Sequence, residues 1–355
     1  MTVYRQLLDE VAAPRLVGSP HHARTREVLR RELTRRGYKI LEHQFPVIPP
    51  GRLAGPLYAG GALVWAAVGV VLLGTGPRVT AAGAALAALL VVGFVLRARG
   101  TGPALVGVNL IGVRPRGRVT VWLAAHYDSK GQPLSMLLRL VAVALAVAGA
   151  LGLATVAALR LGDAASRPAE LLLAAPALVA GLLLLQNRAT NTSPGAVDNA
   201  TALAAVFAIV DRLPPDAPVG VVFPDAEEYG LLGARALVRE RANLFEGAAV
   251  LNLDGIDDRG AILCLTHRAG PTVDAVAAAL RAGRPRFLPV VVDGWALARA
   301  ARECATIMRG DWRTTALVHT RRDRAERLTL EGVREVAAAI AGVLQTRVDG
   351  GGSRV

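Results

Sequence analysis

Apolar and polar positions follow two alternating periods along most of the chain. Segments with apolar residues every three or four positions predict helices, and shorter runs rich in Val, Ile and Leu predict strands. The predicted helices span residues 4–13, 22–36, 199–213, 231–241, 272–282, 296–301 and 330–345, and the predicted strands span 38–47, 105–113, 118–125, 219–223, 248–254, 287–292 and 315–319. Because helices and strands alternate, we expect an α/β fold with a mixed central sheet and helices on both faces.

Four stretches contain no charged side chain: residues 53–77, 79–96, 140–159 and 171–187. A helix needs about 20 apolar residues to cross the hydrocarbon core of a bilayer, whereas a buried helix of a soluble domain normally keeps a polar face. The mean hydropathy of +0.40 and the apolar content of 53% agree with membrane insertion. We therefore predict four transmembrane helices, arranged as two α-hairpins that interrupt the α/β core.

The distribution of arginine predicts how these hairpins are oriented. The flanks on the side of the α/β core carry Arg52, Arg97, Arg99, Arg139 and Arg188, whereas the opposite turns carry Arg78, Arg160 and Arg167. Positive residues are enriched on the cytoplasmic side of membranes. The pattern predicts an integral protein of a bacterial cell membrane whose α/β core lies in the cytoplasm.

Residues suited to metal binding gather in five short segments: His126, Asp128, Asp198, Glu227, Glu228, Asp254 and His319. Each segment follows an apolar β-like run or opens a predicted helix, where α/β folds place their binding loops. Imidazole and carboxylate groups are zinc ligands, and a pair of zinc ions needs about five of them, one of which bridges. An isolated acidic pair such as Glu227-Glu228 is usually a helix-dipole partner, but here it can supply one ligand and one general base. Together, the residues predict a site for two Zn²⁺.

The same residues, in the same order, resemble the zinc-dependent exopeptidase family that includes bacterial leucine aminopeptidases, glutamate carboxypeptidase and the endoplasmic reticulum metallopeptidase. The matching stretches are RLVGSP (15–20), AAHYDS (124–129), PGAVDNA (194–200), FPDAEEYGLLGAR (223–235), LNLD (251–254) and HTRRD (319–323). The resemblance implies that Asp198 bridges the two zinc ions. It further implies that His126 and Asp254 complete one site, and that Glu228 and His319 complete the other.

The resemblance also implies roles for two residues that do not bind metal. Glu227 would be the general base that acts on a water shared by the zinc ions, and Asp128 would orient the ring of His126. Two departures from the family pattern concern substrate recognition. Val197 stands where a second acidic residue is common, and residues 310–312 (GDW) stand where a Ser-Asp-His-like stretch is expected. The residues after Met308 are expected near the substrate pocket.

The resemblance and the apolar stretches together divide the chain. Peptidase-domain segments are expected at residues 1–52, 100–132 and 189–346, transmembrane hairpins at 53–99 and 133–188, and a disordered tail at 347–355. The net charge of +13 comes almost entirely from arginine spread over the helices. This spread predicts attraction to anionic lipid and no binding of nucleic acid. Cys264 and Cys304 lack metal-ligand spacing and are expected to be spectators.

These observations predict a membrane-anchored, two-zinc metallo-exopeptidase, most simply an aminopeptidase that hydrolyses short peptides. Tyr229, Trp295 and Trp312 are candidates for the lining of its substrate pocket. Two alternatives are a single-zinc acyl transferase similar to glutaminyl cyclase and a non-catalytic membrane receptor or scaffold that kept the peptidase fold. The sequence leaves open which end of a peptide is attacked, the side-chain preference, the natural substrate and the oligomeric state.

Overall fold

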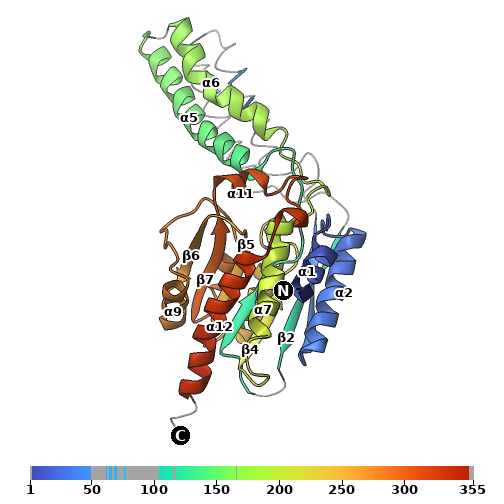
Figure 1. The fold of residues 1–355 in the computed structure, drawn as a ribbon. Coiled ribbons are helices and arrows are strands. Elements are labelled where there is room, and N and C mark those ends of the chain that lie inside the picture. Colours follow the sequence, from blue (N-terminus) through green and yellow to red (C-terminus); the bar gives the residue numbers. More distant parts are fainter. Residues whose placement is uncertain are drawn as a thin grey trace. The chain divides into compact units, whose positions relative to one another are not determined.

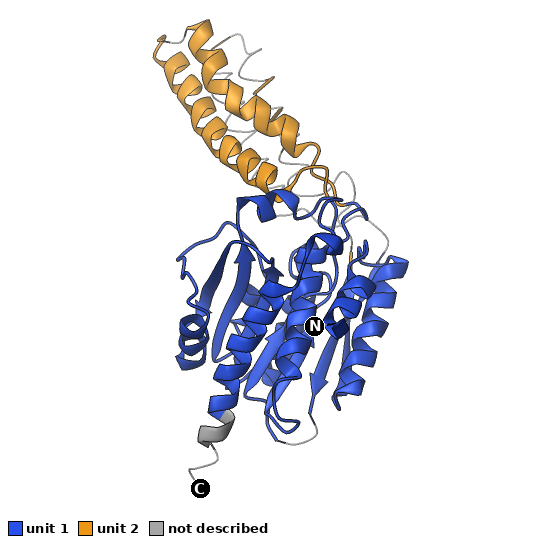
Figure 2. Ribbon diagram, in the orientation of Figure 1, with its two compact units in different colours: residues 1–47, 104–131, 190–355 blue, residues 48–103, 132–189 orange. Residues whose placement is uncertain are grey.

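The computed structural model describes residues 2–48, positions 61, 64, 65, 68, 69 and 76, and residues 104–114, 117–164 and 166–351. The chain divides into two compact units (Figure 2). Unit 1 contains residues 1–47, 104–131 and 190–355, and unit 2 contains residues 48–103 and 132–189. Unit 1 is thus assembled from three stretches of chain that two insertions separate.

Unit 1 is built on a seven-stranded mixed sheet. Its strands are β1 (Lys39–Val47), β2 (Leu105–Val113), β3 (Val121–Ala124), β4 (Val219–Phe223), β5 (Ala249–Ile256), β6 (Ala261–Arg268) and β7 (Glu303–Gly310), in the spatial order β1-β2-β4-β3-β5-β7-β6. The four central strands β4, β3, β5 and β7 run parallel. Strands β1, β2 and β6 each run antiparallel to their neighbours. The carboxyl ends of the four parallel strands meet at one edge, which we call the carboxyl edge.

Helices cover both faces of this sheet (Figure 1). The helices of unit 1 are α1 (Thr2–Val11), α2 (Pro20–Arg35), α7 (Thr201–Val210), α8 (Leu232–Arg241), α9 (Pro271–Ala279), α10 (Gly294–Leu297), α11 (Trp312–Leu317) and α12 (Glu331–Gly351). Successive strand residues point to opposite faces, so Leu123 packs in a core with α7 and α12, whereas Trp122 packs with α8 and α10. These two apolar cores confirm the expected mixed α/β fold.

Most predicted elements of unit 1 form where the sequence placed them, but several predictions were wrong. Residues 315–319 are not a strand, because α11 occupies the region before His319 and Asp311 caps this helix by accepting from the backbone N–H groups of Arg313 and Thr314. Residues 287–292 also form no strand. Instead, β6 and β7 complete the sheet. The sequence analysis left both strands unassigned, although β6 begins with the apolar run AILCL (261–265).

The end of the chain differs from the expected boundary as well. Helix α12 continues to Gly351 and so includes the first residues of the tail that was expected to be disordered. Residues 352–355 lie outside the described residues.

Unit 2 contains two long apolar helices, α5 (Met136–Leu161) and α6 (Arg167–Leu184). Both have the length and composition of membrane-crossing helices. They pack closely, because a Cβ atom added at Gly149 would lie 2.4 Å from the Cα of Ala177, and small residues of this kind allow helices to approach. The described residues thus contain two candidate spans rather than four. The first predicted hairpin, residues 53–99, lies outside the described residues apart from six isolated positions.

The core position of Phe207 generates a stability prediction. Phe207 is fully buried in α7, and its ring centroid lies 5.5 Å from that of Phe223. We expect Phe207→Ala to lower the free energy of unfolding by about 3–5 kcal/mol, because the lost ring leaves a cavity. Phe287 is 72% exposed, so Phe287→Ala is the matched control and should change stability by less than about 0.5 kcal/mol. Denaturant unfolding monitored by circular dichroism measures both, and equal losses would contradict the assigned core.

Candidate metal centre and active site

The predicted metal ligands converge on the carboxyl edge of unit 1. His126 follows β3, Glu228 lies in the short helical turn η2 (Glu227–Tyr229) after β4, and Asp254 lies near the end of β5. Asp198 belongs to the turn η1 (Ala196–Ala200) that leads into α7, and His319 follows α11. All five side chains are buried. The fold therefore brings together residues from five separate segments of the chain.

These residues form two groups of potential ligand atoms that share Asp198. One group is His126, Asp198 and Asp254, and the other is Asp198, Glu228 and His319; within each group the ligand atoms lie within 4.8 Å of one another. Asp198 Oδ1 lies 3.2 Å from His126 Nε2, and Asp198 Oδ2 lies 3.0 Å from His319 Nε2. The two oxygens of Asp198 thus face two different histidines, as a carboxylate that bridges two cations must.

The cluster carries more negative than positive charge. Burial raises the pKa of Glu227 well above its ordinary value, and the nearby charges of Glu228 and Asp254 add to this rise against the opposing charge of His126. Burial also disfavours ionised Asp198, but hydrogen bonds from His126 and His319 outweigh it and hold the pKa of Asp198 well below its usual range. Bound divalent cations would neutralise such a site, and its nitrogen and oxygen donors are those that zinc accepts. The residues therefore fit a zinc centre.

One cation of the protein itself lies beside this cluster. Lys130 Nζ lies 2.9 Å from Glu228 Oε2 and donates to the backbone carbonyl of Glu228, while the Lys130 backbone N–H donates to Glu228 Oε1 at 3.0 Å. Burial opposes ionisation of Glu228, yet the charges of His319 and Lys130 lower its pKa to about 2. Glu228 is therefore held as a carboxylate, the form that binds metal.

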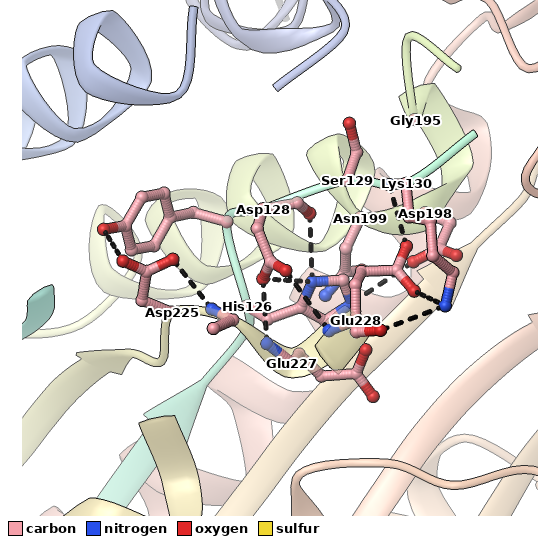
Figure 3. A network of polar contacts seen from close by, with 12 residues as sticks. His126, Asp128, Ser129, Lys130, Gly195, Asp198, Asn199, Asp225, Glu227 and Glu228 are labelled. Carbon is pink, nitrogen blue, oxygen red and sulfur yellow. Dashed lines mark hydrogen bonds and ion pairs between the residues drawn. The ribbon is translucent and has the colours of Figure 1, made fainter. Parts of the chain in front are cut away.

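Asp128 positions the two glutamates as well as His126 (Figure 3). Its Oδ1 accepts the backbone N–H of Glu227 at 3.1 Å, and its Oδ2 accepts that of Glu228 at 3.2 Å. Asp128 Oδ1 also lies 3.5 Å from Nδ1 of His126. One buried carboxylate thus ties the loop after β3 to the turn after β4, a wider role than the orientation of one histidine ring.

Arg15 is the positioning residue for which the sequence pattern assigned no role. It is completely buried, and its guanidinium donates to the backbone carbonyls of Tyr127 at 2.8 Å, Pro194 at 2.5 Å and Gly195 at 2.9 Å. These carbonyls belong to the loop that carries His126 and to the turn before Asp198. The RLVGSP stretch stood out in the sequence, but no pattern identifies a guanidinium whose partners are backbone atoms.

Two buried acids also support the site without having been predicted. Asp323 accepts the backbone N–H groups of Val197 at 2.8 Å and Asp198 at 3.2 Å, and so fixes the turn that carries Asp198. Asp225 accepts from the hydroxyl of Tyr127 at 2.9 Å. Both acids lie within stretches that match the family, and this match was the only sign of them in the sequence. A match alone does not distinguish a metal ligand from a residue that positions one.

Asp293 is a third unpredicted acid, located just before α10. It is fully buried, and neither of its carboxylate oxygens has a hydrogen-bond partner among the described residues. Burial, with the charges of Asp128 and Asp254 and against that of His126, raises the pKa of Asp293 to about 8. A single aspartate after an apolar run gave no signal in the sequence, although its charge interacts with the cluster.

The three aromatic candidates for a substrate pocket lie in different surroundings. Tyr229 packs against an apolar cluster that includes Val17 and Phe45. The ring of Trp295 lies 5.6 Å from that of His267. Trp312 lines a separate cavity on the carboxyl edge.

Comparison with known families assigns the chain. The profile of Peptidase family M28 matches residues 109–344. The chain belongs to Peptidase family M28. Membership of this zinc-dependent family, together with the ligand cluster, makes the chain a zinc metallopeptidase-like hydrolase and confirms the resemblance at the level of the family. A search of curated protein sequences gave no significant match.

Solved structures share the fold of this M28 member. A zinc-dependent exopeptidase from Parabacteroides distasonis has 16% identity and a TM-score of 0.56, with 97% of each chain covered. A zinc aminopeptidase from Bacillus subtilis has 13% identity and a TM-score of 0.57, with 98% of this chain and 94% of that chain covered. A glutaminyl cyclase from Fimbriiglobus ruber has 16% identity and a TM-score of 0.52, with 97% and 93% covered. At these identities the similarity shows a shared fold and does not distinguish the reactions.

The contacts of Arg15 predict a loss of stability on a conservative substitution. We expect Arg15→Lys to lower the free energy of unfolding by about 2–4 kcal/mol, because one ammonium cannot satisfy carbonyls on both ligand-bearing segments. Arg31 is the matched control: its side chain is 56% exposed and pairs with Glu10, so Arg31→Lys should cost less than about 1 kcal/mol. Thermal unfolding and zinc titration of both variants measure the effect. An Arg15→Lys protein with unchanged stability and zinc affinity would contradict the positioning role.

Proposed function

We propose that this M28 member is a membrane-attached metallo-exopeptidase with two zinc ions, most specifically an aminopeptidase that hydrolyses short peptides. The observation that carries the proposal is the pair of ligand groups that share Asp198. His126 and Asp254 would complete one zinc site, and Glu228 and His319 would complete the other. When bound, zinc supplies Lewis-acid polarisation of the scissile carbonyl.

Glu227 is the general base in this proposal. It lies beside both ligand groups without belonging to either, and the hydrogen bond from its backbone N–H to Asp128 fixes its position. A carboxylate at this place can take a proton from the attacking water and pass it to the leaving amine. Asp128 acts as a positioning residue, because it holds Glu227, Glu228 and the ring of His126 at once.

A glutaminyl cyclase-like acyl transferase with one zinc ion is the second candidate. Several glutaminyl cyclases share the fold, with TM-scores of 0.52 for the Fimbriiglobus ruber enzyme and 0.54 for that of Bacteroides thetaiotaomicron. The paired ligand groups favour the two-zinc peptidase, because a single-zinc enzyme has no need for the group that contains His126 and Asp254. The same complete ligand set argues against a non-catalytic receptor or scaffold.

Helices α5 and α6 support attachment to a lipid bilayer. Several of their apolar side chains are strongly exposed, including Val147 at 60%, Leu151 at 67% and Leu172 at 76%. Apolar surface of this extent is normally covered by a partner or a membrane. The number of spans and the placement of unit 1 in the cytoplasm stay predictions, because the first hairpin lies outside the described residues.

Metal content and substrate choice test the reaction together. We expect purified full-length protein in detergent to hold two zinc ions per chain by elemental analysis. It should release amino-terminal residues from free peptides and leave their amino-terminally acetylated counterparts intact. One zinc ion together with cyclisation of amino-terminal glutamine would favour the cyclase instead. Activity on the acetylated peptides from their carboxyl ends would keep an exopeptidase but reverse its direction.

The proposed base is tested by an isosteric substitution. Glu227→Gln is expected to keep its zinc but to lower kcat by roughly 10²- to 10⁴-fold, the usual contribution of general-base catalysis. Glu326, an exposed glutamate of unit 1, supplies the control variant Glu326→Gln, which should retain full activity. Steady-state kinetics and metal analysis are measured on both variants. Near-normal activity of Glu227→Gln with zinc bound would exclude Glu227 as the base.

A further inference from the structure

Both insertions leave unit 1 and return to it at the carboxyl edge. The first leaves after Val47 and returns before Leu105, and these residues pair at the end of β1 and the beginning of β2. The second leaves after Gly131 and returns at Thr190, and an isolated β-bridge joins these two residues. Because β2 runs antiparallel to β4 and Gly131 follows β3, both junctions lie beyond the carboxyl ends of the parallel strands. Any part of either insertion that enters a bilayer is therefore tethered to this edge.

A cavity of about 650 Å³ opens on the same edge. Its walls come from the turn after β5, from α11 after β7, and from the segment that leads into α12. None of the predicted metal ligands lines it. Among the residues that do are three exposed arginines, Arg259, Arg313 and Arg322, and the exposed Trp312.

The acids of this cavity are bound by donors of unit 1. Asp257 accepts from a threonine hydroxyl and an arginine guanidinium, both at 2.7 Å. Asp258 accepts from the backbone N–H groups of Thr329 and Gly332, and from the hydroxyl of Thr329 at 2.9 Å. Asp311 accepts two backbone N–H groups of α11, and Glu331 lies 3.9 Å from Arg334. The three aspartates are thus engaged in holding the walls together, whereas Glu331 is exposed and forms only a long contact within its own helix.

The three exposed arginines have no close ion-pair partner among the described residues. Within the described part of the chain, no carboxylate oxygen lies within 4.0 Å of a guanidinium nitrogen of Arg259, Arg313 or Arg322. Arg313 is nevertheless near enough to Asp311 for their charges to interact. The guanidinium of Arg313 lies 5.3 Å from the ring centroid of Trp312, which is 65% exposed. Tryptophan is enriched at the interface between lipid and water, and arginine reaches phosphate groups with several donors. The cavity therefore presents exposed guanidinium groups beside an exposed aromatic ring.

We propose that this cavity binds the phosphate headgroup of an anionic lipid, and that the carboxyl edge of unit 1 lies against the membrane surface. The inference rests on the membrane attachment proposed above. Arg259, Arg313 and Arg322 contact the phosphate, and Trp312 lies at the level of the headgroups. The metal-ligand cluster shares this edge, so peptide substrates reach it from the lipid surface.

A lipid phosphate is favoured over a free anion by the tethering of both insertions to the same edge. A free phosphate or a peptide carboxylate would also suit three arginines, but neither requires an exposed tryptophan or a nearby membrane. Each arginine near an anionic surface raises affinity by about five-fold. Removal of all three should therefore weaken binding by roughly 100-fold.

The test uses the full-length chain in lipid nanodiscs of phosphatidylcholine, with or without phosphatidylglycerol. Lipids brominated near the headgroup quench nearby tryptophan, and the difference between the wild type and Trp312→Phe isolates the signal of Trp312. We expect quenching of Trp312 that increases with phosphatidylglycerol and is lost in the triple variant Arg259→Gln, Arg313→Gln, Arg322→Gln. The control triple variant is Arg118→Gln, Arg212→Gln, Arg241→Gln, whose positions are exposed and lie near the opposite edge of the sheet. It should behave as the wild type.

Titration of the detergent-solubilised protein with dioctanoyl phosphatidylglycerol or inorganic phosphate separates the sources of the anion. We expect saturable lipid binding, weakened roughly 100-fold in the cavity variant, and no comparable binding of phosphate. Equal binding of phosphate, or quenching that is the same in both lipid mixtures, would overturn the inference. The cavity variant can also be assayed in nanodiscs of phosphatidylcholine alone, with peptides that have a free carboxylate. A higher KM than that of the wild type would overturn the lipid site and indicate that the cavity recognises the substrate.

The failure of this inference is distinguishable from that of the proposed function. Release of the protein from native membranes by alkaline carbonate would overturn membrane attachment and the lipid site together. A protein that resists carbonate but shows no quenching of Trp312 would overturn the lipid site alone. A protein without peptidase activity that still shows the lipid-dependent quenching would overturn the proposed reaction and leave the lipid site standing.

Discussion

The rest of the structure depends on the compensation of buried negative charge at the carboxyl edge of unit 1. Asp198, Glu228 and Asp254 are buried together with Glu227 and Asp128, and burial of an uncompensated carboxylate is costly. Two histidines and one lysine reach the cluster directly. Metal cations would supply the remaining positive charge. The need for this additional positive charge explains why the carboxyl edge is suited to binding zinc.

Hydrogen bonds between buried side chains and backbone groups position the candidate ligands. Asp128 and Asp323 each accept two backbone N–H groups from segments that carry a ligand or the proposed base. Arg15 performs the complementary task, because it binds backbone carbonyls of two ligand-bearing loops. The positions of the candidate ligands thus depend on supporting residues outside the two ligand groups.

The placement of the two insertions follows from the same architecture. Val47 pairs with Leu105, and Gly131 with Thr190, so short contacts within unit 1 close each gap in the chain. An insertion whose ends are already neighbours adds little strain to the domain that receives it. The sheet therefore keeps its register while two helices of membrane-crossing length and composition are added to a peptidase fold.

The sequence alone determined the fold class, the apolar stretches and the residues of the candidate metal site. Buried parallel strands such as β4 are continuous apolar runs, and zinc chemistry requires particular residue types, so both are recorded in residue identity. Tertiary structure decided the elements and hydrogen bonds that depend on residues distant in the sequence. Residues 315–317 became helix because Asp311 caps α11, and β6 and β7 formed because each found a neighbouring strand. Every residue carries a backbone carbonyl and an N–H group, so no sequence pattern reveals which of them Arg15 or Asp323 will bind.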